Sequence, residues 1–129
     1  MSWIPLHVHS QYSILEALPS TKALAKRAQE NGMPALALTD YGMMYGAVEF
    51  YKACRANDIK PIIGCCLYVA TKSRFEKERG IGNRYSYPVV LLAKNRRGYE
   101  NLCILSSKGH IEGFYYKPRI DKELLAQHS

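Results

Sequence analysis

The chain has 129 residues, of which 47% are hydrophobic and 22% charged, a composition typical of a folded globular domain that excludes the disordered and fibrous classes. The 18 lysine and arginine residues against 11 acidic ones give a net charge of +7, which favours polyanionic partners. No apolar run approaches the roughly 20 residues of a membrane helix, and the N-terminus has no secretory signal, so we expect a cytoplasmic protein without membrane contact.

The first half of the chain alternates short apolar runs with helical patterns. Residues 4–9 are predicted to form a strand. A helix follows Pro19, with Ser20 as its N-cap and Asn31-Gly32 at its end. Residues 35–39 are apolar up to the final threonine, which is typical of a strand buried on both faces.

The second half continues this alternation. A helix is expected over residues 45–56, a strand over residues 59–70 and a further strand over residues 89–93. Asn95 should cap a third helix that ends near Gly109, and Asp121 should cap a fourth. Strands that alternate with helices through short links are typical of right-handed crossovers, so we predict an α/β fold with a parallel sheet.

Residues 71–87 are rich in charged and small side chains and are expected to form an exposed, mobile loop. The cations that we single out in it are Lys72, Arg74, Lys77 and Arg84. Aromatic side chains stand between them, a combination that can follow a nucleic-acid backbone. Glutamates in the same run dilute the charge, and a solvated loop without a ligand is the alternative.

The four cysteines have no zinc-finger spacing and no Cys-x-x-Cys pair. Without a secretory signal, they are expected to be reduced thiols. Cys65 and Cys66 are adjacent in a predicted strand, where neighbouring side chains point to opposite faces. Only one of the two can therefore face a given site.

Two histidines lie two positions apart in the first predicted strand. There His7 and His9 would project from the same face about 6.6 Å apart, and paired imidazoles at a strand end can ligate a divalent metal. Glu16 follows after a turn and would add a carboxylate. The alternative is a pair of surface or hydrogen-bonded histidines with no ligand role.

Asp40 stands where the strand over residues 35–39 leaves the sheet. In parallel α/β folds the carboxyl ends of the strands form the functional face, which makes this carboxylate a site candidate. An aspartate in that position can equally be a helix cap or a turn former, and both interpretations stay open.

Seven segments of the chain, in order and at matching spacings, resemble the N-terminal PHP (polymerase and histidinol phosphatase) domain of bacterial DNA polymerase III alpha subunits. They are residues 6–13, 34–40, 46–51, 59–64, 91–95, 98–102 and 112–121. The resemblance covers nearly the whole chain. It implies the N-terminal half of a distorted (βα)7 barrel, with residues 1–129 as part of a single PHP domain. It also implies a parent chain that is a DNA-directed DNA polymerase, a nucleotidyltransferase whose palm, fingers and thumb lie outside these residues.

The resemblance further implies a set of metal ligands. In metal-binding PHP domains, histidines and carboxylates hold two or three divalent ions that activate water for phosphoester hydrolysis. The first family histidines match His7 and His9, and the acid that follows them corresponds to Glu16, one methylene longer than the usual aspartate. Asp40 also matches, but the family histidine after it is Tyr41 here, and a phenol is a poor ligand at neutral pH.

Two further ligand positions differ from the family pattern. The family glutamate after the third predicted strand is Cys66 here, and the family histidine before the fourth is Pro88, which has no ligating group. A thiolate can hold zinc, so a single zinc or manganese site built around the paired histidines and Cys66 is an alternative to an empty site. Magnesium is expected only in the polymerase core outside this chain.

These residues are consistent with three alternative functions. The first is a degenerate, non-catalytic module that stabilises the rest of the alpha chain and docks a proofreading exonuclease subunit. The second is a metal-dependent phosphoesterase that uses His7 and His9 as ligands. The third is a nucleic-acid binder driven by positive charge. A fragment that stops partway round a barrel should also expose a strand edge and associate with other copies.

Overall fold

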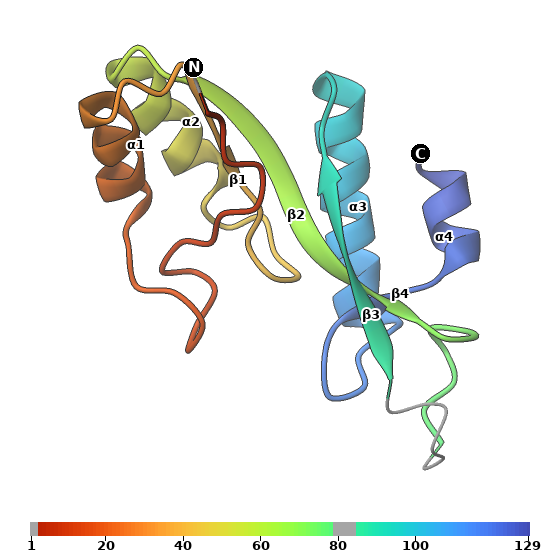
Figure 1. Cartoon of the computed structure of the whole chain (residues 1–129). Helices are drawn as coiled ribbons and strands as arrows, with labels where there is room; N and C mark the ends of the chain where they lie inside the picture. The colour runs from red at the N-terminus through yellow and green to blue at the C-terminus, as the bar shows by residue number, and fades with distance from the viewer. Residues whose placement is uncertain (1–2, 79–84) are drawn as a thin grey trace.

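The structure, a computed structural model, describes residues 3–78 and 85–129. Its elements in chain order are α1 (Thr21–Glu30), β1 (Ala35–Leu38), α2 (Ala47–Ala56), β2 (Lys60–Ala70), β3 (Ser86–Leu92), α3 (Arg96–Ile111), β4 (Arg119–Ile120) and α4 (Lys122–Gln127). Figure 1 shows two groups of elements joined by the long strand β2: α1, α2 and β1 on one side, and β3, α3 and α4 on the other. None of the described helices is long and apolar enough to cross a membrane.

The helix boundaries follow the capping residues of the sequence. The Ser20 hydroxyl accepts a hydrogen bond from the Ala23 N–H at 3.1 Å, and Asn95 caps α3 in the same way through the Gly98 N–H at 3.0 Å. Asp121 caps α4 by accepting from the Leu124 N–H at 3.0 Å. The three predicted N-caps are therefore confirmed, because each side chain satisfies a backbone donor that the helix leaves unpaired.

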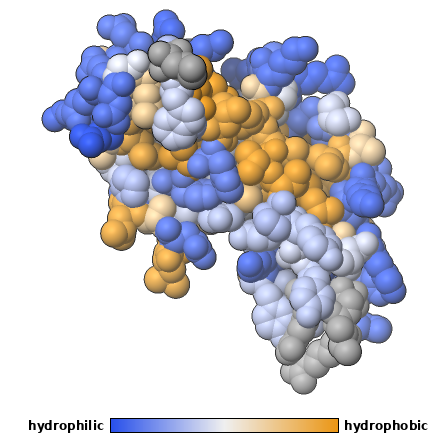
Figure 2. All heavy atoms as spheres, viewed as in Figure 1, coloured by the Kyte–Doolittle hydropathy of each residue, from blue (hydrophilic) through white to orange (hydrophobic). Residues whose placement is uncertain are grey.

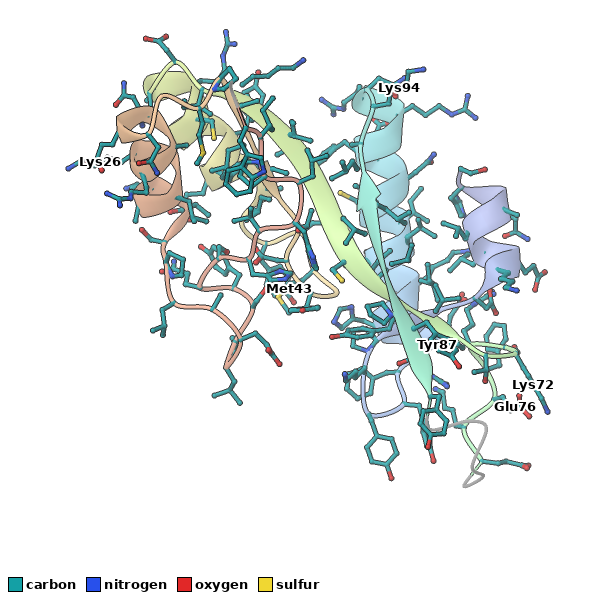
Figure 3. The ribbon with its side chains drawn as sticks, viewed as in Figure 1. Lys26, Met43, Lys72, Glu76, Tyr87 and Lys94 are labelled. Carbon is teal, nitrogen blue, oxygen red and sulfur yellow. The ribbon has the colours of Figure 1, made fainter. Side chains whose placement is uncertain are left out.

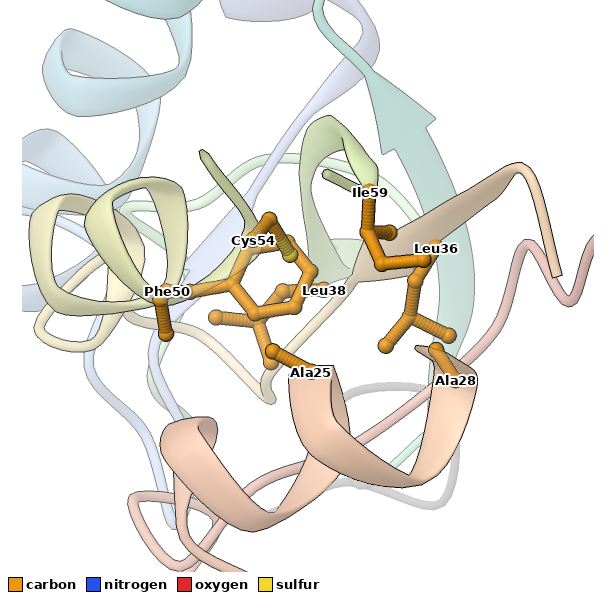
Figure 4. Packing of buried hydrophobic residues seen from close by; sticks show 8 residues of the cluster. Ala25, Ala28, Leu36, Leu38, Phe50, Cys54 and Ile59 are labelled. Atoms are coloured by element: carbon orange, nitrogen blue, oxygen red, sulfur yellow. The ribbon is translucent and has the colours of Figure 1, made fainter. Parts of the chain in front are cut away.

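The two groups of elements each have their own apolar core. The first lies between α1, α2 and β1, and Figure 4 shows its packing. Its fully buried members are Ala25, Ala28, Leu36, Leu38, Phe50, Ala53, Cys54 and Ile59. The second core lies between β2, α3 and α4 and consists of Cys65, Leu67, Leu102, Leu105, Ile120 and Leu124. All four residues of β1 are buried, as its apolar sequence predicts.

The sheet is mixed, so the expectation of an all-parallel sheet is wrong. β1 pairs with β2 in parallel, and β4 also pairs with β2 in parallel. β3 pairs antiparallel to β2 over seven residues, from Gly64 opposite Leu92 to Ala70 opposite Ser86. The described part of the connection between β2 and β3 contains no helix. Without a crossover helix the chain turns back on itself, and antiparallel pairing follows.

β2 changes neighbours at Gly64, where the pairing with β1 has just ended and the pairing with β3 begins. A Cβ atom at this position would lie 2.6 Å from the Leu91 carbonyl oxygen and 2.8 Å from the Leu92 side chain. Only glycine allows β3 to approach so closely, and this approach joins the two halves of the sheet.

Residues 4–9 do not form the predicted strand. The segment runs beside β1, where the Pro5 carbonyl accepts from the Ala37 N–H at 3.2 Å and the Val8 carbonyl from the Thr39 N–H at 2.7 Å. The Val8 N–H, however, donates to the Thr39 hydroxyl at 2.9 Å. Because Pro5 has no N–H and Val8 uses a side-chain acceptor, no regular ladder forms.

Candidate functional site

The carboxylate of Asp40 lies at the end of β1 and is 2% exposed. It accepts hydrogen bonds from the Ser10 N–H at 2.6 Å, the Ser10 hydroxyl at 2.7 Å and the Ser13 hydroxyl at 2.7 Å. Both carboxylate oxygens are therefore used by the turn that follows the histidines. The structure therefore shows Asp40 as a turn former, with partners 27 and 30 residues away in sequence, while its role as a metal ligand stays a prediction.

Four rings stack from the N-terminal segment to β2, and we call them the ring ladder: His7, His9, Tyr41 and Tyr68. The His7 and His9 centroids are 4.7 Å apart, edge to face. His9 stacks on Tyr41 at 4.1 Å, and Tyr41 is nearly parallel to Tyr68 at 5.9 Å. The predicted proximity of the two histidines is thus present, although no regular strand positions them.

The tyrosines of the ring ladder come from neighbouring elements. Tyr41 forms an isolated parallel bridge with Cys66, in which the Gly42 N–H donates to the Cys66 carbonyl at 2.8 Å. Tyr68 lies two residues further along β2 and so points to the same side as Cys66. Side chains alternate between the two faces of a strand, so the spacing of two residues could have placed Tyr68 on the same face as Cys66. The sequence prediction did not include Tyr68 in the site.

The electrostatics around His9 favour a neutral imidazole. Burial lowers its pKa, the neighbouring His7 lowers it further, and a hydrogen bond with the Thr39 backbone and the charges of Asp40 and Glu16 oppose these effects only in part. Its Nδ1 atom is buried and has no hydrogen-bond partner among the described residues. Glu16 itself is exposed, and its charge also raises the pKa of Tyr68, after burial, Cys66 and Tyr41. Glu16 therefore lies at the edge of the ring ladder.

The two adjacent cysteines face opposite sides of β2, as predicted. Cys65 packs into the second core, and burial raises the pKa of its thiol to about 12. Cys66 lies beneath the ring ladder and is 1% exposed, and burial raises its pKa as well. Without a metal both sulfurs are therefore protonated thiols at neutral pH, and zinc binding at Cys66 would release its proton.

These residues do not fit a metal centre of the type that the sequence resemblance implies. The Asp40 oxygens already accept three protein hydrogen bonds, and Tyr41 covers one face of His9. Across residues 3–78 and 85–129, no three histidine, cysteine or acidic side chains gather as metal ligands would. The orphaned Nδ1 of His9 is the one feature that favours a ligand there.

The basic loop is not uniformly exposed. Arg74 is 8% exposed, and its guanidinium donates to Glu112 at 2.6 Å and to Asp121 at 2.9 Å. The prediction of a solvated Arg74 is wrong, because carboxylates 38 and 47 residues later pair with it. Lys72 and Lys77 are exposed, and Arg84 lies outside the described residues. Figure 3 labels Lys72 and Glu76, an ion pair at 4.0 Å near the far end of β2.

Residues 5–129 match the PHP domain family. The chain is similar to DNA polymerase III subunit alpha of Chlamydia trachomatis, with 59% identity over 129 residues that cover all of this chain and 10% of that protein. The same protein of Treponema pallidum is 57% identical over 130 residues, and that of Thermus aquaticus is 48% identical over 127 residues. The Treponema match covers 100% of this chain and 11% of that protein, and the Thermus match covers 96% of this chain and 10% of that protein. The chain spans about a tenth of the length of the curated relatives it matches.

Two solved structures share the fold. An amidohydrolase from Chromobacterium violaceum, with bound sulfate and no metal, superposes with a TM-score of 0.55 at 22% identity over 81% of this chain and 34% of its own. A candidate metal-dependent phosphoesterase from Bifidobacterium adolescentis superposes with a TM-score of 0.60 at 12% identity over 85% of this chain and 34% of its own. At these identities the likeness concerns the fold alone.

Proposed function

We propose, from the premise that the chain belongs to the PHP domain family, that it serves as a non-catalytic structural module of a replicative DNA polymerase. The high identity to DNA polymerase III alpha subunits supports this parent chain. In this proposal the remainder of the alpha chain completes the (βα)7 barrel and supplies polymerase activity in the cytoplasm. A proofreading exonuclease subunit is the proposed docking partner, and DNA is reached through the parent polymerase.

The observation that carries this proposal is the ring ladder at the position of the family's metal ligands. Stacked rings connect the N-terminal segment, the end of β1 and the second half of β2 through non-covalent contacts. The hydrogen bonds to Asp40 fix the turn at residues 10–13 to the same place. The side chains that would hold ions in other PHP domains thus connect segments of this chain to one another.

The metal content of the purified protein tests the proposal. Wild type, the double variant His7→Ala/His9→Ala and the control His128→Ala are dialysed against metal-free buffer and analysed for zinc and manganese. His128 caps the far end of α4 and is remote from the ring ladder. We expect less than a tenth of a metal equivalent in all three proteins, and no release of nitrophenol from a nitrophenyl phosphate.

The second candidate function, a metal-dependent phosphoesterase using His7 and His9, rests on the orphaned Nδ1 of His9. About one tightly held ion per chain in wild type and in His128→Ala, lost in the double variant, would overturn the structural proposal. Phosphoesterase turnover that disappears with the same ion would establish the enzymatic one in its place.

A further inference from the structure

Five exposed aromatic side chains lie in the segments that meet where β2 pairs with β3 and β4. Phe75 is 58% exposed and Tyr116 is 69% exposed, and further exposed rings in the same part of the chain are Tyr85, Tyr87 and Phe114. Figure 2 shows pale side chains gathered on this lobe, apart from the hydrophobic stripe at the centre of the view. Large rings in solvent at one end of a domain mark a binding surface.

Two buried arginines contact rings of this group through cation–π interactions. The Arg74 guanidinium lies 4.3 Å from the Phe75 ring centre, and the Arg119 guanidinium lies 5.1 Å from that of Tyr115. Tyr115 contacts Tyr116 edge to face at 4.7 Å. We call Phe75, Tyr115, Tyr116 and these two arginines the aromatic belt.

The belt is rigid because its arginines are buried and hydrogen-bonded. Arg119 donates to the carbonyls of Gly113 at 3.0 Å, Arg74 at 3.3 Å and Glu76 at 3.0 Å. Arg74 is tied to Glu112 and Asp121. The loop after β2 and the loop after α3 are thereby fixed to each other, and their exposed rings are presented in a set arrangement.

The backbone of Tyr116 is in the left-handed region, with φ at 60°. Bulky aromatic residues rarely adopt this conformation, which glycine occupies without strain. An isolated bridge between Tyr115 and Lys117 closes the tight turn around it. The contact with Tyr115 leaves the side chain of Tyr116 mostly in solvent, and such strain at an exposed residue is typical of ligand-binding positions.

Exposed cations accompany the rings. Lys117 places its ammonium 4.4 Å from the Tyr68 ring centre, and Lys77 is exposed two residues after Phe75 in sequence. The positive charges of Arg74 and Arg119 together balance the two negative charges of Glu112 and Asp121, so these carboxylates do not cancel the exposed lysines. Exposed rings between lysines match single-stranded nucleic acid, whose unpaired bases stack on rings while its phosphates meet cations. A duplex keeps its base faces covered and cannot stack in this way.

We propose that the aromatic belt binds single-stranded nucleic acid, with bases stacking on Phe75 and Tyr116 and phosphates meeting Lys77 and Lys117. This inference goes beyond the structural role proposed above and involves no metal, although Lys117 lies over Tyr68, the last ring of the ring ladder. It also restricts the nucleic-acid hypothesis drawn from the sequence, since Arg74 supports the surface from within and does not contact phosphate.

Fluorescence anisotropy with a labelled oligothymidine of about 12 nucleotides, in the range of site sizes for such surfaces, tests the proposal in EDTA at low salt. We expect Tyr116→Ala and Phe75→Ala each to weaken binding about tenfold. Tyr116→Phe should retain it, because the ring is preserved. The matched control is Tyr45→Ala, whose ring is 72% exposed in the segment before α2 and is not part of the belt. Circular dichroism confirms that each variant is folded, and Phe75→Leu and Tyr116→Leu replace the corresponding alanine variants if these are not.

Lys77→Gln should weaken binding at low salt and reduce its salt dependence, since one phosphate contact is lost. Four results would overturn the proposal: no binding by wild type, an equal loss in Tyr45→Ala, equally tight binding of a duplex of the same length, or equally effective competition by polyglutamate. The last would identify an acidic protein segment as the partner. None of these results depends on metal content, so this proposal and the structural one can fail separately.

Discussion

Asp40 and Tyr41 are adjacent in sequence and stabilise the same site through different interactions, hydrogen bonds for Asp40 and ring stacking for Tyr41. Asp40 accepts three hydrogen bonds that fix the turn at residues 10–13, and Tyr41 provides the central ring between His9 and Tyr68. Both act on segments about 30 residues away along the chain. Their side chains therefore contribute tertiary connections rather than local structure.

Asp40→Asn should lower the free energy of unfolding by about 2 to 3 kcal/mol, because the amide cannot accept from all three donors and leaves buried groups of Ser10 or Ser13 unpaired. Urea unfolding followed by circular dichroism measures the change. Asp58→Asn is the control, since Asp58 is exposed with φ at 56°, which asparagine tolerates. An equal loss in both variants would show that Asp40 has no special structural role.

Tyr41→Ala should lower the free energy of unfolding by about 2 kcal/mol through lost stacking and burial. Tyr41→Phe, which keeps the ring, should stay close to wild type. Tyr45→Ala serves as the exposed control, and thermal unfolding of the four proteins provides the comparison. If Tyr41→Ala is as stable as Tyr45→Ala, the ring ladder does not stabilise the chain.

The proximity of the two histidines and the position of Asp40 at the end of a strand could be predicted from the sequence, because the spacing of residues along one segment determines them. The partners of Arg74 could not, since Glu112 and Asp121 come from α3 and the start of α4. Tyr41 was considered only as a replaced ligand. Its stacking depends on how close β1 and β2 bring two rings, which spacing does not reveal.

The strand β3 was predicted as an element, but its direction in the sheet was not. A strand was predicted over residues 89–93, whereas β3 covers Ser86–Leu92 and begins within the segment that was predicted as a loop. The helices α1, α2 and α3 were identified from their periodicity and their end residues. The direction of β3 was wrong because the alternation of strands and helices was extended across a connection without a helix. Local patterns define elements well, whereas strand direction depends on the connection between them.

The contact between the loop after β2 and the start of α4 should depend on pH. Burial alone would raise the pKa of Asp121, but hydrogen bonds from the Arg74 and Leu124 N–H groups and the Arg74 guanidinium lower it overall. A carboxyl with a depressed folded pKa stabilises the fold above its unfolded pKa, roughly 3.9, and this contribution is lost as the pH falls through the folded pKa.

Asp121→Asn should therefore be about 3 kcal/mol less stable than wild type at pH 7, because Arg74 loses a buried partner. The difference should shrink as the pH falls from about 4 through the lower pKa of the folded carboxyl. Urea unfolding at a series of pH values measures both curves. Two curves that stay parallel down to the most acidic pH would contradict the assignment.

The molecule as a whole is an open, mixed sheet with a core on either side of the point where β2 changes partners. No described strand pairs with the free edge of β3. A hollow of about 690 Å³ lies between α2, β2 and the start of α3, and it is lined by apolar residues that include Val48 and Tyr51. Figure 2 shows the hydrophobic surface that crosses the middle of this view.

At high concentration the 129-residue chain should associate with further copies, because an unpaired strand edge and an apolar hollow are both in solvent. Size-exclusion chromatography with light scattering measures the mass across a dilution series. Val48→Lys/Tyr51→Lys should shift the equilibrium toward the monomer, since both side chains are at least half exposed and line the hollow. A wild-type mass equal to one chain at every concentration would refute this expectation.

The central claim is that the fold is held by the ring ladder and the hydrogen bonds of Asp40, and that it needs no ion. Thermal unfolding of the wild-type protein in EDTA, in zinc and in manganese tests it most directly, since a ligand bound by the folded state alone at about 100 times its Kd adds about 2.7 kcal/mol. We predict the same unfolding midpoint in all three buffers. A midpoint several degrees higher in either metal, and restored to the lower value by EDTA, would contradict the account.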